Sequence, residues 1–278
     1  MNRCSVVILT RNEEAMVERA IASARFADEI LIVDSGSTDA TVAIAEAAGA
    51  RVVVRPFDDF ARQRNFALEQ ATGEWVLFVD ADERVTPALD AEVRALLGTE
   101  PEHDAYAVPR EAIALGHRLG WEPFGAPDAP VRLVRRGTCT WSGVVHEAIE
   151  GARSFGRLDG SLLHLTHRTV SEVVRKIDAY SELEAADLVR TGRQAPSKRA
   201  LLVSFPREVV RLWRSGLKDE GMPGAIEACL LAFNRTLVLA KVWEHAHRDD
   251  IAAAYARAEQ EAAGEAAREG RGRNVPLR

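Results

Sequence analysis

Residues 5–39, SVVILTRNEEAMVERAIASARFADEILIVDSGSTD, hold two short apolar runs on either side of a segment with helical spacing. The runs, Ser5–Leu9 and Glu29–Val33, are rich in β-branched side chains, as strands buried on both faces are. Between them, Val17 and Ile21 lie on one stripe of a helix. This stretch therefore predicts a βαβ unit, in which two parallel strands are joined by a right-handed crossover.

The same alternation continues to residue 83. The expected elements are a helix over 40–48 closed by Gly49, a strand Val52–Val54, a helix Phe60–Ala71 and a strand Trp75–Val79. Strands alternating with helices predict an α/β fold with a mostly parallel central sheet flanked by helices. Ligands of such sheets bind outside the carboxyl ends of the strands. Thr10-Arg11, Asp34-Ser35 and Asp80-Ala81-Asp82 are therefore expected at one edge.

Composition narrows the class of protein. The chain has 278 residues, of which 47% are hydrophobic and 28% charged, which is typical of a globular protein. Its net charge of −6 argues against bulk nucleic-acid binding. Cys4, Cys139 and Cys229 lack the spacing of a zinc site or a disulfide framework, which indicates a reducing compartment. Residues 1–20 show no signal peptide, so a cytoplasmic protein is expected.

The later part of the chain changes character twice. Residues 100–170 alternate short apolar runs with glycine and proline, which predicts further strands of mixed direction joined by loops. From Ser171 onward the pattern is helical, with Val173, Ile177 and Tyr180 on one stripe. Pro206, Pro223 and Gly224 are expected to break the later helices.

Two carboxylates, Asp80 and Asp82, follow the apolar run WVLFV. Carboxylates so placed repel each other unless a cation intervenes, and Mg²⁺ or Mn²⁺ takes one or two of them together with phosphate oxygens. The alternative is a solvated turn. Asp34 is expected to be free to accept hydrogen bonds from a ligand, because Ser37, Thr38 or Asp39 fits a helix N-cap better. Neither a dinucleotide fingerprint nor a glycine-rich phosphate loop is present.

Taken in order, SVVILTRNEE, LIVDSGSTDAT, ARQRNFAL and GEWVLFVDADE resemble the family 2 glycosyltransferases of the GT-A fold. The later WSGVVHEAIEG and KIDAYSELEA resemble, within that family, bacterial transferases of the β-1,4-glucosyltransferase or heptosyltransferase-like kind that build the lipopolysaccharide core. The resemblance implies a Rossmann-like GT-A domain with a helical C-terminal extension. Residues 1–95 would form its nucleotide-sugar-binding half, 96–170 its acceptor-binding half and 171–278 the extension.

The resemblance also implies a nucleotide-sugar donor (a UDP-sugar), a divalent ion on the D-x-D pair and inversion at the anomeric carbon. The donor-binding residues it assigns are Thr10, Arg11 and Glu13 around the nucleoside, Asp34 at the base, Arg64 near the base or phosphates and Asp80 near the ribose or donor sugar. Asp82 would ligate the metal. Ser35 departs from the second acid that the broad family often has, which leaves the base contacts open.

Transfer needs a group that accepts the proton of the acceptor hydroxyl. His146 and Glu147, after Trp141-Ser142-Gly143, are the candidates, and we favour Glu147 because the family base is an acid downstream of the D-x-D pair. Adjacent strand residues point to opposite faces, so one of the two is expected to reach the acceptor. His146 is either the base in its place or a histidine with a supporting or structural role.

Other basic side chains have two interpretations each. Arg132, Arg135 and Arg136 would hold the diphosphate by bidentate contacts or form a solvated basic edge. His164 and His167 would meet a metal or phosphate or, as we favour, be buried strand histidines.

A basic and apolar segment, residues 198–218, suits an anionic lipid surface, or a helix packed on the catalytic domain with its charges solvated. The apolar stretch Ala225–Trp243 contains Glu227, Arg235 and Lys241 and is not expected to span a bilayer.

The sequence thus predicts a metal-dependent inverting glycosyltransferase at the cytoplasmic side of a membrane, acting on a hydroxyl of a lipid-linked surface glycan. The alternatives are a polyprenyl-phosphate sugar synthase, a sugar-nucleotide pyrophosphorylase and a non-catalytic glycan-binding protein.

Overall fold

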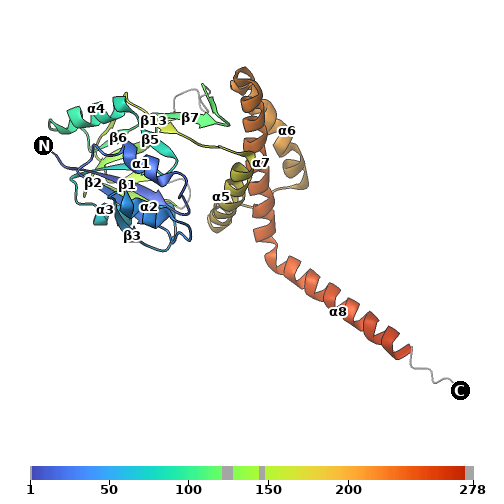
Figure 1. The fold of residues 1–278 in the computed structure, drawn as a ribbon. Coiled ribbons are helices and arrows are strands. Elements are labelled where there is room, and N and C mark those ends of the chain that lie inside the picture. The colour runs from blue at the N-terminus through green and yellow to red at the C-terminus, as the bar shows by residue number, and fades with distance from the viewer. Residues whose placement is uncertain (1, 121–127, 144–147, 273–278) are drawn as a thin grey trace.

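The computed structural model describes residues 2–120, 128–143 and 148–272, with side chains described as far as residue 262. An α/β domain is followed by a helical extension (Figure 1). The α/β fold with a mostly parallel central sheet and a helical C-terminal region, as predicted from the sequence, is confirmed. The two candidate bases, His146 and Glu147, lie outside the described residues.

The main sheet has seven strands in the order β12-β6-β9-β4-β1-β2-β3. Its parallel centre consists of β1 (Cys4–Thr10), β2 (Glu29–Asp34), β3 (Arg51–Val54) and β4 (Trp75–Asp80). Beyond β4 lie β9 (Val131–Arg135), which is antiparallel to it, β6 (Ala105–Ala107) and β12 (Phe155–Arg157). The apolar runs of β1, β2 and β4 are buried on both faces, which explains their β-branched composition.

Two smaller sheets complete the domain. One contains β5 (Glu83–Val85), β13 (Leu162–His164), β7 (Arg110–Ala114) and β8 (His117–Arg118), and the other pairs β10 (Thr140–Ser142) with β11 (Ala148–Glu150). In the antiparallel pairing of β13 with β5, His164 stands opposite Glu83. This pairing brings His164 next to the end of β4.

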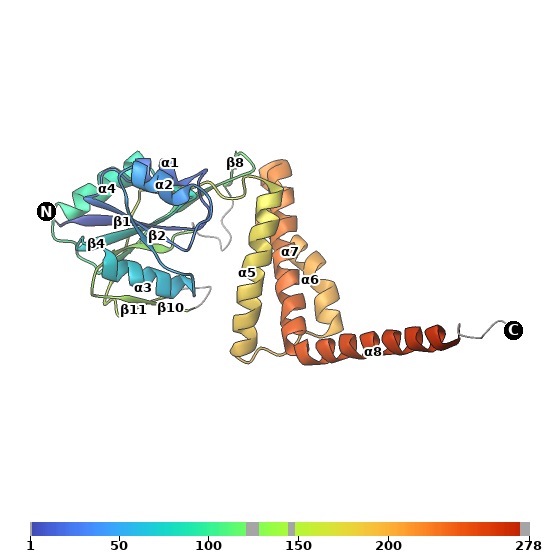
Figure 2. The same cartoon turned by 60° about the horizontal axis from the view of Figure 1, so that its bottom comes forward.

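Helices cover both faces of the main sheet (Figure 2). On one face pack α1 (Val17–Ser23), α2 (Thr41–Ala47) and α4 (Pro87–Leu97), and on the other α3 (Phe60–Gln70) together with the β10–β11 pair. The sequence analysis did not predict α4. Its signals are a Thr86 N-cap, a proline at the first helical position and buried side chains at Leu89, Val93 and Leu97.

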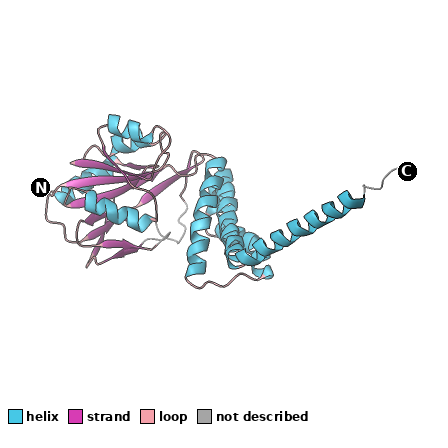
Figure 3. Cartoon of the chain, turned by 90° about the horizontal axis from the view of Figure 1, so that it is seen from below, coloured by secondary structure: helices cyan, strands magenta, loops and turns pink. Residues whose placement is uncertain are grey.

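The extension consists of α5 (Val170–Arg190), α6 (Lys198–Arg214), a short 3-10 helix (Leu217–Glu220), α7 (Gly221–Ala246) and α8 (Arg248–Gly272). Helix α7 packs against both α5 and α6, and α5 lies next to the α/β domain (Figure 2). Figure 3 shows the helices of the extension grouped outside the strands, with α8 projecting away. No helix among the described residues combines the length and apolar character needed to cross a bilayer.

The prolines do not break the later helices as expected. Pro206 lies inside α6, and Pro223 lies in the first turn of α7, where a backbone N–H has no partner within the helix. The break between α6 and α7 falls at Gly216, whose φ of +127° is outside the range of an L side chain in a helix. Pro206 has no N–H to donate to the carbonyl of Leu202, one turn earlier in α6. Because Leu202 is exposed, water can hydrogen-bond to that carbonyl instead.

Candidate active site

The carboxyl ends of β1 and β2 meet through one carboxylate. Asp34 accepts hydrogen bonds from Thr10 Oγ1 (2.8 Å) and Ser37 Oγ (2.6 Å), and from the backbone N–H groups of Gly36 (2.9 Å) and Ser37 (2.7 Å). Its acceptor positions are thus filled within the chain, and it is 1% exposed. This differs from the expectation that Asp34 is free for a ligand. The side chain holds the loop after β2 in shape, and the base contact stays a prediction.

The loop after β1 is fastened to the same region. Asn12, in the left-handed conformation with φ of 57°, donates its N–H to Ser37 Oγ (2.8 Å) and accepts from the N–H of Thr38 (2.8 Å). The N–H of Glu13 donates to Thr41 Oγ1 (2.7 Å), and Arg11 is exposed beside it. The polar residues predicted to line a nucleoside pocket are therefore brought to one edge by loops that brace each other.

Asp80, at the end of β4, lies among arginines. Arg132 Nη2 is 2.6 Å from its Oδ2 and Arg64 Nη2 is 3.7 Å from its Oδ1. Burial opposes ionisation, but Arg132 and Arg64 outweigh it and hold the pKa of Asp80 well below its usual range. Arg64 also packs against the rings of Phe78 and Trp141, with centroids at 5.2 and 5.0 Å. Asp80 is thus kept ionised while a third of its side chain is exposed.

Glu83 is a buried anion that the sequence analysis missed. It is 0% exposed, and its carboxylate lies 2.9 Å from Arg132 Nη2 and 3.4 Å from Arg110 Nη1. It also accepts the N–H of Asp80 at 2.9 Å. Arg132 therefore bridges Asp80 and Glu83, and its side chain is only 4% exposed. In this structure Arg132 serves these carboxylates, whereas the sequence analysis placed it on the donor's diphosphate.

Arg135 and Arg136 lie at the opposite end of the sheet. β9 runs antiparallel to β4, so Arg135 stands opposite Trp75, at the start of that strand. It pairs with Glu74 (2.7 Å), and Arg136 donates to the carbonyl of Gly73 (2.8 Å). Of the two interpretations given to these arginines, contact with a diphosphate does not fit them, because they are at the amino ends of the parallel strands.

Asp82 contacts the helical extension. Its Oδ2 is 2.9 Å from Nζ of Lys176 on α5, and its Oδ1 is 3.6 Å from Nε2 of His164 on β13. Burial would raise the pKa of Asp82, but the neighbouring His164 and Lys176 lower it to about 2. Lys176 was not identified from the sequence. The signal that could have found it is the segment KIDAYSELEA, which begins at this residue and carried part of the family resemblance.

The two histidines of LHLTH have different surroundings. His164, 20% exposed at its side chain, faces Asp82, whereas His167 Nδ1 lies 2.8 Å from Glu227 Oε2 on α7. A carboxylate oxygen and an imidazole nitrogen are ligands that Mn²⁺ accepts, and substrate phosphates and water complete such a shell. Asp82 and His164 therefore fit a divalent ion. Within the described residues, no cluster of three or more His, Cys, Asp or Glu side chains has metal-binding geometry.

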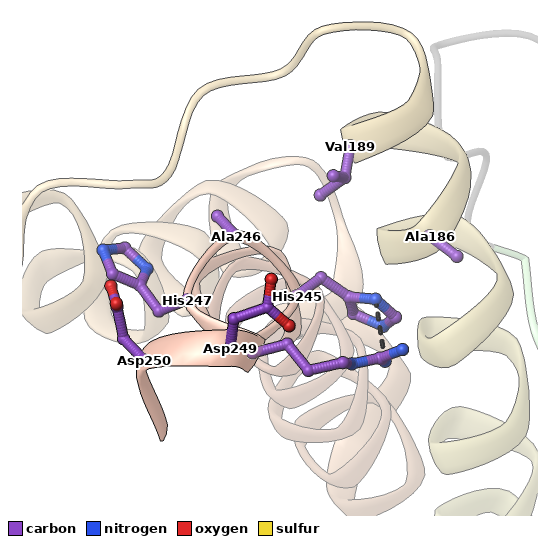
Figure 4. Close-up of a pocket in the computed structure, with 8 residues that line it drawn as sticks. Ala186, Val189, His245, Ala246, His247, Asp249 and Asp250 are labelled. Atoms are coloured by element: carbon purple, nitrogen blue, oxygen red, sulfur yellow. Dashed lines mark hydrogen bonds between the residues drawn. The ribbon is translucent and has the colours of Figure 1, made fainter. Parts of the chain in front are cut away.

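A cavity of about 220 Å³ opens between the sheet edge and α5. Glu13 and Asp82 line it from the α/β domain, and Arg168, Arg175 and Lys176 line it from α5 and the residues just before. Burial and the charge of Asp82 raise the pKa of Glu13. A larger cavity, of about 430 Å³, lies where α5, α7 and α8 meet (Figure 4). None of the residues predicted for the site lines that second cavity.

Known proteins resemble the chain at several levels. The family model for glycosyl transferase family 2 matches residues 5–126. The lipopolysaccharide core biosynthesis glycosyltransferase LpsC of Rhizobium meliloti (strain 1021) is 35% identical over 250 residues, which cover 86% of this chain and 92% of LpsC. An uncharacterized glycosyltransferase of Rickettsia felis is 28% identical over 257 residues, or 88% and 90% of the two chains.

A solved structure resembles the fold. The crystal structure of S. aureus TarS 1–349 aligns with a TM-score of 0.48 and 17% identity, covering 89% of this chain and 92% of that one.

Proposed function

The chain belongs to glycosyl transferase family 2 and is a glycosyltransferase, and from that premise we propose that it transfers a sugar, with inversion, from a UDP-sugar to a hydroxyl of the lipopolysaccharide core or another lipid-linked surface glycan. One observation carries this proposal: the 35% identity to LpsC runs over 250 residues, so it includes the acceptor half and the extension as well as the donor half. A relative that shared only the nucleotide-binding half would say nothing about the acceptor.

The reaction fits the charges at the sheet edge. The acceptor oxygen forms a bond to the anomeric carbon as the bond from that carbon to the diphosphate oxygen breaks. The bonding electron pair stays on the diphosphate, and the hydroxyl proton passes to a base, for which Glu147 remains our candidate and His146 the alternative. A divalent ion held by Asp82 and His164 would stabilise the negative charge of the leaving group as a Lewis acid.

The chain's own residues do the positioning. Thr10 and Asp34 brace the loops expected around the nucleoside. Arg64 and Arg132 keep Asp80 ionised and fixed, so that it can accept hydrogen bonds from hydroxyls of the ribose or the donor sugar. Such orientation contributes to rate because it removes the entropic cost of aligning the reactants.

The test of this function is a panel of nucleotide sugars scored for thermal stabilisation and hydrolysis, followed by transfer to glycan and to polyprenyl-phosphate acceptors. We expect a UDP-sugar to be used with Mn²⁺ or Mg²⁺ and a glycan hydroxyl to accept. Transfer to polyprenyl phosphate instead would make the chain a lipid-phosphate sugar synthase. Binding without transfer or hydrolysis would point to a glycan-binding protein.

Two substitutions separate the assigned roles. D82A should remove the dependence of UDP binding on the divalent ion, measured by calorimetry, while the exposed control D90A leaves it intact. Unchanged affinity for UDP with Mn²⁺ in D82A would refute the metal assignment. E147Q should abolish transfer but keep donor binding, and near-normal turnover would mean that the base lies elsewhere.

We also propose that α6 contacts an anionic lipid surface, where a lipid-linked acceptor would be found. The helix packs on α7, on the side away from the α/β domain, and not on the catalytic domain as one interpretation of the sequence had it. Only Leu212 is buried among its side chains. Leu202 (68%), Val210 (47%) and Trp213 (43%) are exposed. Among residues 198–218 the basic side chains are Lys198, Arg199, Arg207, Arg211, Arg214 and Lys218, with Glu208 as the acid within α6.

This combination favours an anionic bilayer over a neutral partner, because apolar side chains insert at the interface while the basic ones meet lipid phosphates. The chain as a whole is negative, so general charge would oppose the contact. Sedimentation with phosphatidylglycerol vesicles should pull down the protein, and L202S/W213S should lose most of that binding, whereas M222S, outside α6, should not. Equal binding to neutral vesicles, or a dimer in solution that L202S/W213S abolishes, would refute it.

A further inference from the structure

Helix α5 contacts the donor edge at two points, one helical turn apart. Lys176 Nζ lies 2.9 Å from Asp82, and Tyr180 stacks on Phe60 with ring centroids 5.6 Å apart and planes at 9°. Phe60 is one turn before Arg64 on α3, and Arg64 is the residue that pairs with Asp80. Because side chains four apart share a face of a helix, one face of α5 is applied to the Asp80–Asp82 edge.

The contact of Lys176 is not needed to attach the extension. Glu220 meets His117 Nε2 (2.8 Å) and the N–H of Gly120 (2.9 Å), and Glu227 meets His167 (2.8 Å). The side chain of Lys176 is 48% exposed, so its pair with Asp82 is screened by water and adds little to stability. Stabilising the fold therefore does not explain why half-exposed Lys176 contacts Asp82, the candidate metal-binding carboxylate, and a role in ligand binding is the alternative.

Charge in the cavity supports such a role. The wall from the α/β domain has the acids Glu13 and Asp82, and the wall from α5 and the residues before it has three cations, Arg168, Arg175 and Lys176, and one acid, Glu172. The ammonium of a lysine carries a positive charge at neutral pH. Arg168 is engaged by Glu172 at 2.8 Å. Of these cations, Lys176 is the one that contacts Asp82 and has a flexible stem long enough to change partner.

We propose that Lys176 is a donor-binding residue with two partners: it neutralises Asp82 when the site is free of donor, and it binds the diphosphate of the donor when that ligand and a divalent cation are present. This inference rests on the proposed function. The ammonium lies on Oδ2 of Asp82, and a divalent cation shared with His164 would lie on the Oδ1 side. The two positive charges would therefore repel each other across one carboxylate and bind it in competition. On the diphosphate they act together, since each neutralises part of its charge.

The two partners predict effects of opposite sign for K176A. Mn²⁺ alone should bind more tightly than in the wild type, by several-fold, because a competing positive charge is gone. UDP in saturating Mn²⁺ should bind roughly tenfold more weakly, because a charged hydrogen bond to the diphosphate is lost. K176R should stay near the wild type for UDP, since its guanidinium also binds phosphate.

The experiment is calorimetric titration of the full chain with Mn²⁺ alone and then with UDP at saturating Mn²⁺. K241A is the matched control: it breaks another lysine contact to α5, with Asp178 at 2.8 Å, away from Asp82, and should change neither affinity. K176M, which keeps the aliphatic stem, replaces K176A if circular dichroism shows that K176A is misfolded.

Weakening of both Mn²⁺ and UDP binding in K176A, or no change in either, would overturn the proposal, since a packing role gives the first result and an idle residue the second. Failure of the wild-type chain to bind UDP with Mn²⁺ or Mg²⁺ would instead overturn the proposed function. The two failures are therefore distinguishable.

Discussion

Replacing Glu83 by glutamine tests how much the buried charge cluster of Asp80, Glu83 and Arg132 contributes to the free energy of unfolding. Glu83 is 0% exposed and Arg132 is 3% exposed, so their 2.9 Å contact is shielded from water. E83Q keeps the shape of the side chain and an oxygen for the N–H of Asp80, but it removes the negative charge. Of the two carboxylates that Arg132 contacts, Asp80, at 2.6 Å, then keeps its charge, and Asp80 is partly exposed.

Removing one partner of a buried ion pair costs about 3–5 kcal/mol, because the other charge is left uncompensated. Since Asp80 still offsets part of the charge of Arg132, we expect the lower end, about 3 kcal/mol of unfolding free energy. Urea unfolding followed by circular dichroism measures it. The double variant E83Q/R132Q should cost less than the two single variants together, because the uncompensated charge is removed with its partner.

A loss below about 0.5 kcal/mol in E83Q, or strictly additive costs in the double variant, would refute this reasoning. Either result would mean that water or another group already screens the pair. The exposed pair Arg94–Asp90, 2.5 Å apart on α4, is the control, because D90N should change stability by less than about 1 kcal/mol.

Three further predictions concern residues around the same sheet. G73A should destabilise the fold by about 1–3 kcal/mol in urea unfolding, because a Cβ there would lie 2.6 Å from the backbone nitrogen of Ser5; a wild-type value would contradict the close approach. Burial would raise the pKa of Glu29, but hydrogen bonds from Ser5, Thr72 and Arg51 lower it to about 2. The stabilisation that ionised Glu29 gives the fold is therefore present above pH 4.5 and is lost as the pH falls toward 2. The melting temperature of E29Q should vary less between pH 4.5 and pH 2 than that of the wild type. Parallel curves of melting temperature against pH for the two proteins would exclude this contribution of Glu29. D34N should speed hydrogen exchange at the N–H groups of Gly36 and Ser37, which Asp34 holds, and unchanged exchange would mean that the loop is held otherwise.

The sequence was informative where structure is local. The period of the apolar residues predicted β1, β2, β3 and β4 to within about a residue. β1, β2 and β4 are buried on both faces, and α2, which leads into the partly exposed β3, ends just before Gly49. It follows that the convergence of Thr10, Asp34 and Asp80 at one edge could also be predicted, since parallel strands end on the same side.

The sequence was misleading where direction or distant contacts decide. β9 is antiparallel, so its early residue Arg132 lies near the end of β4, while Arg135, three positions later, lies near its start. The period of the apolar residues does not give the direction of a strand. Unless the direction of β9 is known, the sequence VRLVRR does not show which of its three arginines lies near the end of β4. The stripe predicted for α5 also placed Tyr180 inward with Val173 and Ile177, but Tyr180 faces Phe60 instead.

The charges of the site are divided along the chain in a way that makes the donor edge depend on the rest of the protein. The carboxylates Asp80, Asp82 and Glu83 all come from the end of β4 and the start of β5. Their cationic partners come from earlier and later elements: Arg64 from α3, Arg132 from β9 and Lys176 from α5. An edge with acids alone would repel a diphosphate. Two of these three cations come from β9 and α5. If the proposed function holds, binding of an anionic donor at this edge should therefore depend on the folding of residues 96–170 and of the extension, the parts of the chain predicted to meet the acceptor.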